Sequence, residues 1–110
     1  MTLRSASGKR DAVILDGGYK TTELVSIAAS NVTIADLTLR RVRNHLIHVV
    51  PGPASHTTGT LIQNCKLVDP GQQAIKINAD PARPYFADNG VIAGCSIELT
   101  AAGRTLIRDD

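Results

Sequence analysis

The sequence predicts an all-β protein with the fold of a right-handed parallel β-helix (solenoid) of about three to four coils. An apolar motif recurs at offsets of 28 and 30 residues, and each repeat holds short segments in which apolar residues alternate with polar ones. No segment shows helical periodicity. Repeats built only from short strands stack on one another, so equivalent strands are expected to form parallel sheets.

Each repeat begins with two strands joined by a corner. Asp36, Asn64 and Gly94 lie at the three corners, and these residue types tolerate the left-handed backbone that a sharp corner needs. The predicted strands span 32–34, 60–62 and 90–92 before the corners, and 37–39, 65–67 and 95–97 after them. Stacking predicts two inward ladders, one formed by Ile34, Ile62 and Ile92 and the other by Leu39, Leu67 and Ile97.

A third strand is predicted at 47–49 and again 28 residues later at 75–77, and residues 25–27 fit the same pattern. Their apolar residues are expected to point inward, which displays Ser26, His48 and Lys76 on the outer face. Residues 13–15 begin a partial first coil. The corresponding strand of the last repeat, near 104–108, matches the pattern poorly.

Two long connections, 50–59 and 78–89, interrupt the winding at the same point of the coil, whereas the equivalent link at 28–31 is short. Loops inserted in solenoid repeats project from one side and often border a binding face. These two flank the strand that displays His48 and Lys76. The segments Asp16-Gly17-Gly18 and Asp69-Pro70-Gly71 are predicted to be turns.

The runs 31–39, 59–67 and 89–97 resemble coils of the pectate-lyase-like superfamily of parallel β-helices. The run from Asp69 to Asn78 resembles uncharacterised secreted bacterial proteins of that repeat class. The resemblance covers about residues 11 to 100. It implies a secreted or cell-surface parent protein, although the chain itself predicts no compartment.

In that superfamily, acidic polysaccharides lie along the parallel sheet, and the lyases use an Arg or Lys base, sometimes with calcium held by carboxylates. This sequence has no acidic cluster on successive predicted strands and no Arg at the outward positions of the third strand. We therefore predict no catalytic residue, with Lys76 and His48 as the only candidates for such a role. No metal and no cofactor are predicted.

The candidates for ligand binding are Lys76, His48, Arg83, Tyr85 and Phe86. A cation on the outer strand could meet a uronate, and a Tyr-Phe pair beside charged residues could contact a sugar. For the two strand residues, the competing interpretation is a solvated sheet face. For the two aromatic residues, it is an anchor that holds the 12-residue loop onto the solenoid.

Cys65 and Cys95 occupy the same inward position in successive coils. Their Cα atoms could lie close enough for a disulfide, but a neighbouring parallel pair would have to distort the ladder to reach the required torsion. Stacked free thiols are the favoured interpretation, because Cys behaves as a small buried hydrophobe. An inward position provides neither a base nor a route to solvent, which argues against a nucleophilic role.

Composition excludes several classes of function. The net charge of +2 is diffuse, and the aromatic content of 3% includes no Trp, so we predict no nucleic-acid partner. No apolar run approaches the about 20 residues that span a bilayer, so no membrane partner is predicted.

We expect residues 1–110 to form one β-helix domain that is a fragment of a longer solenoid. A short solenoid exposes unpaired strands at both ends, and no amphipathic capping helix is predicted, so we expect a homo-oligomer formed through a coil end or a sheet face. The leading hypothesis for function is a non-catalytic structural or carbohydrate-facing module. A fragment of a polysaccharide lyase or hydrolase and a self-assembling module without a ligand are the alternatives.

Overall fold

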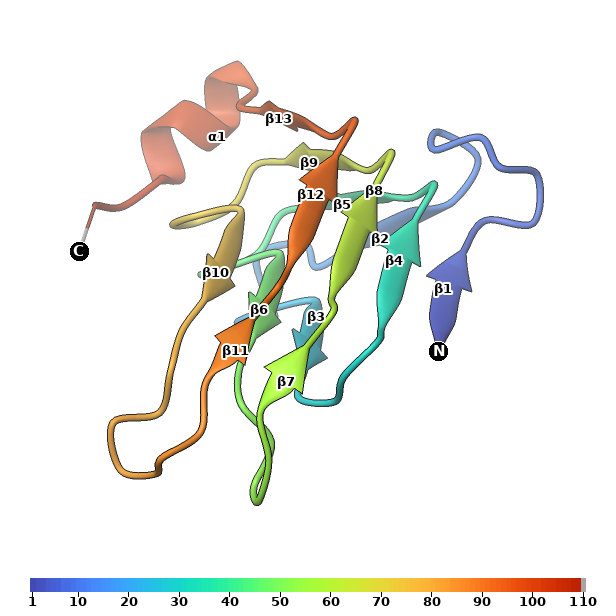
Figure 1. Cartoon of the computed structure of the whole chain (residues 1–110). Helices are drawn as coiled ribbons and strands as arrows, with labels where there is room; N and C mark the ends of the chain where they lie inside the picture. The colour runs from blue at the N-terminus through green and yellow to red at the C-terminus, as the bar shows by residue number, and fades with distance from the viewer. Residues whose placement is uncertain (110) are drawn as a thin grey trace.

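The computed structural model describes residues 1–109, and it confirms the predicted fold class. The chain is all-β with 34% strand, and its parallel sheets stack as a β-solenoid of about three turns (Figure 1). Asp110, the last residue of the predicted domain, lies outside the described residues.

Three sheets form the sides of the solenoid, and every strand pair in them is parallel. Sheet A contains β1 (Thr2–Arg4), β4 (Thr33–Ala35), β8 (Leu61–Gln63) and β12 (Val91–Ala93) in that order. Sheet B contains β2 (Ile14–Asp16), β5 (Thr38–Arg40), β9 (Lys66–Val68) and β13 (Ser96–Glu98). Sheet C contains β3 (Val25–Ile27), β6 (Ile47–Val49) and β10 (Ile75–Ile77).

A small fourth sheet, sheet D, pairs β7 (Thr57–Thr58) with β11 (Ala87–Asp88). Both strands lie inside the segments that were predicted only as long loops. The sequence pattern also missed β1, which pairs with β4 and adds a first coil. Strands of two or three residues with few apolar positions leave almost no alternation to detect, and it is pairing with the next coil that holds them extended.

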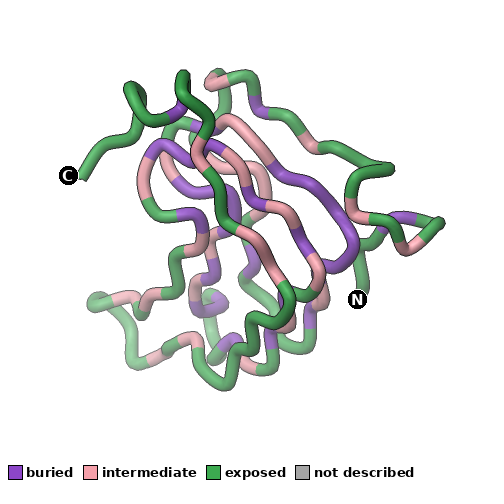
Figure 2. Tube along the Cα trace, turned by 90° about the horizontal axis from the view of Figure 1, so that it is seen from above, coloured by how far each residue is buried: buried purple, intermediate pink, exposed green. Residues whose placement is uncertain are grey.

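The two predicted inward ladders are present and in register. Ile34, Ile62 and Ile92 are successive Cα partners in sheet A, and Leu39, Leu67 and Ile97 are successive partners in sheet B. Each ladder gains a first rung that was not predicted, Leu3 in sheet A and Leu15 in sheet B. The middle coils are therefore closely packed inside, and Figure 2 shows buried segments enclosed by exposed loops and ends.

The corners between strands have left-handed backbone, as predicted for Asp36, Asn64 and Gly94, whose φ values are 57°, 50° and 63°. A second ladder of this kind links sheet C or D to sheet A and consists of Asn31, Gly59 and Asn89. Both ladders contain only Asn, Asp and Gly, the residues for which this conformation costs least. Repeating the same turn in each coil keeps the strands in register.

The last coil contains a helix, α1 (Ala101–Leu106), so the expectation that the chain holds no helix was wrong. Thr100 caps it, because its Oγ1 accepts a hydrogen bond from the Gly103 N–H at 3.1 Å. Gly103 fits against Asp69, where a Cβ would lie 1.9 Å from the carboxylate. Six residues are too few for helical periodicity to show in a sequence.

Both ends of the solenoid expose ladder residues that are buried in the middle. Ile62 is 1% exposed, whereas Ile92, its partner in the last coil, is 51% exposed; Ile97 is 62% exposed. At the other end, Leu3 is 41% exposed. Helix α1 therefore leaves the C-terminal coil end open, although it occupies the place of that coil's sheet C strand.

The exposure gradient predicts different costs for truncating residues of one ladder. Leu39→Ala, in the fully buried rung, should lower the free energy of unfolding by about 3 kcal/mol, because it leaves a cavity. Ile97→Ala, in the exposed rung, should cost about 1 kcal/mol or less. Urea unfolding followed by circular dichroism measures both, and equal losses would contradict the packing described for the two coils.

Candidate functional site

The predicted strand residues lie on the outer face of sheet C. His48 in β6 is the Cα partner of Ser26 in β3 and of Lys76 in β10. Glu23 Oε1 accepts a hydrogen bond from His48 Nδ1 at 2.7 Å, and Asn78 Oδ1 contacts His48 Nε2. The hydrogen bonds of His48 thus connect three successive coils.

The amide of Asn78 is oriented by a second hydrogen bond, in which its Nδ2 donates to the carbonyl of Ala79 at 2.9 Å. This leaves Oδ1 facing His48, so both ring nitrogens of His48 face acceptors. Neither nitrogen is free to exchange a proton with a substrate in this arrangement. Lys76 is exposed beside His48, and the described residues place no carboxylate against it.

The loop residues form a separate group. Arg83 pairs with Asp80 at 2.7 Å, while the rings of Tyr85 and Phe86 contact His56 with centroid distances of 5.5 and 4.0 Å. The Phe86 N–H donates to His56 Nδ1 at 3.1 Å, which ties the second long loop to the first. No printed contact of this group reaches His48 or Lys76 within the described chain, so the five candidates do not form one site.

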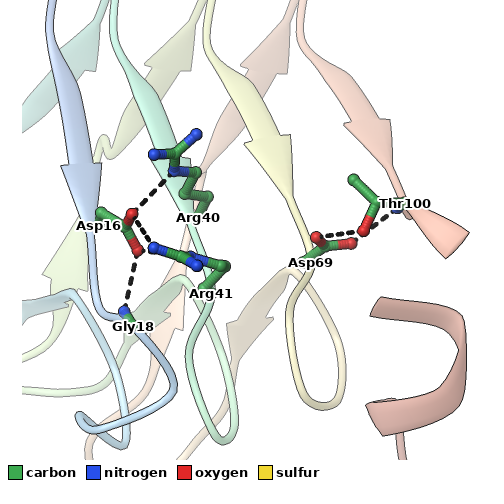
Figure 3. Close-up of polar contacts among 6 residues, drawn as sticks. All are labelled: Asp16, Gly18, Arg40, Arg41, Asp69 and Thr100. Atoms are coloured by element: carbon green, nitrogen blue, oxygen red, sulfur yellow. Dashed lines mark hydrogen bonds and ion pairs between the residues drawn. The ribbon is translucent and has the colours of Figure 1, made fainter. Parts of the chain in front are cut away.

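The structure shows a cleft that the sequence did not predict, at the corner that follows the strands of sheet B (Figure 3). Its volume is about 300 Å³. Four successive coils and the start of α1 contribute its lining, which consists of Tyr19, Arg40, Arg41, Val68, Asp69, Thr100 and Ala102. The cleft therefore lies on the side of the solenoid and not at a coil end.

Asp16 organises one wall of this cleft (Figure 3). Its carboxylate accepts hydrogen bonds from Arg40 Nε at 2.9 Å, from Arg41 Nε at 2.8 Å and from the Gly18 N–H at 2.9 Å. A terminal nitrogen of Arg41 also contacts the carboxylate. Arg41 is the main reason why the pKa of Asp16 lies well below its usual range.

Asp69 forms the opposite wall and is almost completely buried. Thr100 donates to it twice, from its backbone N–H at 2.8 Å and from its Oγ1 at 2.7 Å (Figure 3). These two bonds attach the start of α1 to the preceding coil. The helix thereby closes one side of the cleft.

Tyr19 is the least usual residue of the lining. It has left-handed backbone with φ 59°, and its Oη is buried with no hydrogen-bond partner among the described residues. Burial is the main cause of a raised pKa for Tyr19, and the nearby Asp69 raises it further. The phenol is therefore protonated at neutral pH and can donate a hydrogen bond.

A signal for this cleft was present in the sequence. Arg41 has φ 58° at a corner position whose equivalents in the other two corner ladders are Asn, Asp or Gly. An Arg at such a position is unusual, because left-handed backbone costs most residues energy. Asp69 and the Asp16-Gly17-Gly18 segment are turns, as predicted, but their side chains also build the cleft.

Cys65 and Cys95 are free thiols at successive inward positions. Their sulfurs lie 3.7 Å from the Ile34 carbonyl and 3.6 Å from the Ile62 carbonyl, respectively. Burial raises the pKa of Cys65. Within residues 1–109, no group of three or more His, Cys, Asp or Glu side chains could hold a metal ion.

The cysteines should differ in reactivity, because the thiolate is the reactive form and Cys65 is both buried and raised in pKa. Under native conditions, iodoacetamide should modify the half-buried Cys95 first. Mass spectrometry of Cys65→Ser and Cys95→Ser variants identifies the site, and denatured protein is the control in which both thiols react. Faster native labelling of Cys65 would contradict the inward placement.

The lowered pKa of Asp16 predicts a loss of stability in acid. The unfolded chain binds a proton at an ordinary aspartate pKa of about 3.9, where the folded carboxylate does not, so this contribution is complete above that pH and falls below it. Asp16→Asn should therefore be less stable than wild type at pH 7 and lose less stability between pH 5 and pH 3. Urea unfolding checks this, with Asp11→Asn, which removes an exposed carboxylate, as the control; parallel pH profiles for wild type and Asp16→Asn would contradict it.

No helix of the described residues is long and apolar enough to cross a membrane. Comparisons with protein-family models, with curated proteins and with solved structures found no match. The fold of this chain therefore rests on its own strand pairing, and its function has to be argued from its own surfaces.

Proposed function

We propose that this chain is a non-catalytic β-helix module whose role is structural, and that it joins end to end with a second copy of itself. The exposed ladder residues of the last coil carry this proposal. The coil motifs that resemble the pectate-lyase-like superfamily are compatible with such a module in a larger secreted or surface protein. The proposal combines the structural and the self-assembling hypotheses.

The C-terminal coil end combines two features that favour association. The edges of β12 and β13 have no further strand to pair with in the described chain, and an unpaired edge is a template for another strand. Ile92 and Ile97 add apolar side chains to these edges. Covering both features would bury apolar surface and satisfy backbone groups at once.

The N-terminal coil end is complementary in shape. It has an apolar hollow of about 260 Å³, whose lining includes Met1, Leu3, Val25, Ile27 and Ile34. The edges of β1 and β2 border this end. A protruding isoleucine of a second copy would find apolar surface and a strand edge together in this hollow.

Stacking head to tail would continue both ladders across the joint. Leu3 belongs to the ladder that ends with Ile92, and Leu15 to the ladder that ends with Ile97, so each apolar rung would meet another. Helix α1 takes the place of a fourth strand in sheet C, so only sheets A and B would continue. Such a contact is heterologous and can repeat, which makes longer chains of copies possible.

A carbohydrate-facing role is the second candidate, and one observation favours it. Phe86 is 48% exposed although its ring packs on His56, so an apolar ring face is held in place at the surface of a loop. Ring faces of this kind contact sugars. The lyase alternative has less support, because both nitrogens of His48 are engaged, and release of unsaturated sugars that disappears in Lys76→Ala would favour it.

Light scattering over a hundredfold range of protein concentration tests the association, and the average mass should rise with concentration. Ile97→Lys blocks the C-terminal end and Leu3→Lys blocks the N-terminal end, because a charge would be buried in each joint. Each variant alone should remain monomeric. An equimolar mixture should form a one-to-one pair, since one partner keeps an intact N-terminal end and the other an intact C-terminal end.

Gln63→Lys is the matched control, because it adds the same charge at an exposed position on the side of the solenoid, and it should associate like wild type. Association of Leu3→Lys alone would indicate a symmetric contact between two C-terminal ends. A wild-type chain that stays monomeric at every concentration would refute the proposal.

A further inference from the structure

We infer that the cleft beside sheet B binds a small carboxylate ligand that carries a hydroxyl group near its carboxylate. This inference does not rest on the proposed self-association, because the cleft lies on the side of the solenoid, away from both coil ends. Three observations carry it: unused donors on one wall, an acceptor on the other, and backbone conformations that are unusual for their residue types.

The first wall offers donors. Asp16 engages the Nε atoms of Arg40 and Arg41 and one terminal nitrogen of Arg41. The terminal nitrogens of Arg40 and the second terminal nitrogen of Arg41 have no partner among the described residues. With the unpartnered Tyr19 Oη, they form a set of donors whose natural acceptor is a carboxylate, which guanidinium groups bind through paired hydrogen bonds.

The second wall offers an acceptor. Each oxygen of Asp69 accepts one hydrogen bond from Thr100, and a carboxylate has about four lone-pair sites, so capacity remains. A second carboxylate beside Asp69 would be repelled, whereas a hydroxyl could donate to it. The ligand therefore needs its charge near the Tyr19 and Arg41 side and a hydroxyl near Asp69.

The charges of the cleft permit an anion. Asp16 offsets one of the two lining arginines and Asp69 the other, while Arg43 adds a positive charge at the rim, where its Nε donates to the Tyr19 carbonyl at 3.1 Å. The balance of these groups is +1. A volume of about 300 Å³ is at the lower end of the range for ligand sites, which fits a small organic acid.

Structural stability does not account for all features of the cleft. The Asp16 clamp explains why Arg41 is tolerated at a left-handed corner, but it leaves the Tyr19 hydroxyl buried and unpartnered. A buried donor without a partner destabilises a fold, and left-handed non-glycine residues concentrate at functional sites. A ligand carboxylate would give this hydroxyl its acceptor.

The test uses glycolate, acetate and ethylene glycol as probes, which are matched in size but carry both groups, only the carboxylate, or only hydroxyls. Each is titrated into the ¹⁵N-labelled full chain, and the amide signals of Gly18, Arg41 and Asp69 are followed by NMR. Glycolate should shift these signals saturably, acetate should bind more weakly, and ethylene glycol should not bind. The methyl glycoside of glucuronate then separates the sources: binding assigns the ligand to a chain-linked sugar acid, and exclusion assigns it to a free acid.

Tyr19→Phe is the most informative variant. It should weaken glycolate binding about tenfold, because a hydrogen bond to a charged group is lost, while the thermal midpoint stays equal or rises, because the hydroxyl has no partner in the free protein. Tyr85→Phe, which removes a hydroxyl from the long loop, is the matched control and should bind like wild type. If Tyr19→Phe does not fold, Arg40→Gln gives the same test, since Arg41 still holds Asp16.

Three results would overturn the inference: shifts that stay linear and unsaturated with every probe, ethylene glycol binding as well as glycolate, or unchanged glycolate binding in both variants. Repeating the titration with the Ile97→Lys variant separates this test from the proposed self-association, because a ligand site on the side of the solenoid should survive when a coil end is blocked.

Discussion

Parallel in-register stacking of equivalent residues is the constraint on which the rest of the structure depends. Because each strand lies about 4.8 Å from its equivalent in the next coil, a residue has its counterparts of the neighbouring coils as its nearest contacts. This explains the ladder of Ile34 and Ile62, the repeated left-handed corners, and the His48 hydrogen bonds that link three coils. It also explains the exposed ends, where the stacking partner is missing.

Stacking made much of the fold predictable from the sequence. The offset of 28 residues between Ile34 and Ile62 correctly placed both inward ladders, and Asp36, Asn64 and Gly94 correctly placed a corner. The strand β1, the two strands of sheet D and helix α1 could not be predicted in this way. They lie where a repeat unit is incomplete or interrupted, so they have no periodic counterpart in the sequence.

The candidate sites were less predictable than the fold. The outward alternation of the third strand correctly brought His48 and Lys76 together, but it could not show that Glu23 and Asn78 engage both nitrogens of His48. The cleft depends on residues 24 to 31 positions apart that meet only at one corner of the solenoid, and on a helix without sequence periodicity. Only Arg41, at a position suited to Asn or Gly, indicated it in advance.

The length of the repeat varies at one place only. β8 and β9 begin five residues apart, as do β12 and β13, so the two extra residues of the longer repeat lie entirely in the loop that leads to β11. Sheet D pairs the two loops again before they re-enter sheet A, which isolates the ladders from changes in loop length. Foreign peptides grafted into 50–56 or 79–86 would therefore be displayed side by side on a rigid frame, at a spacing fixed by the rise of one coil.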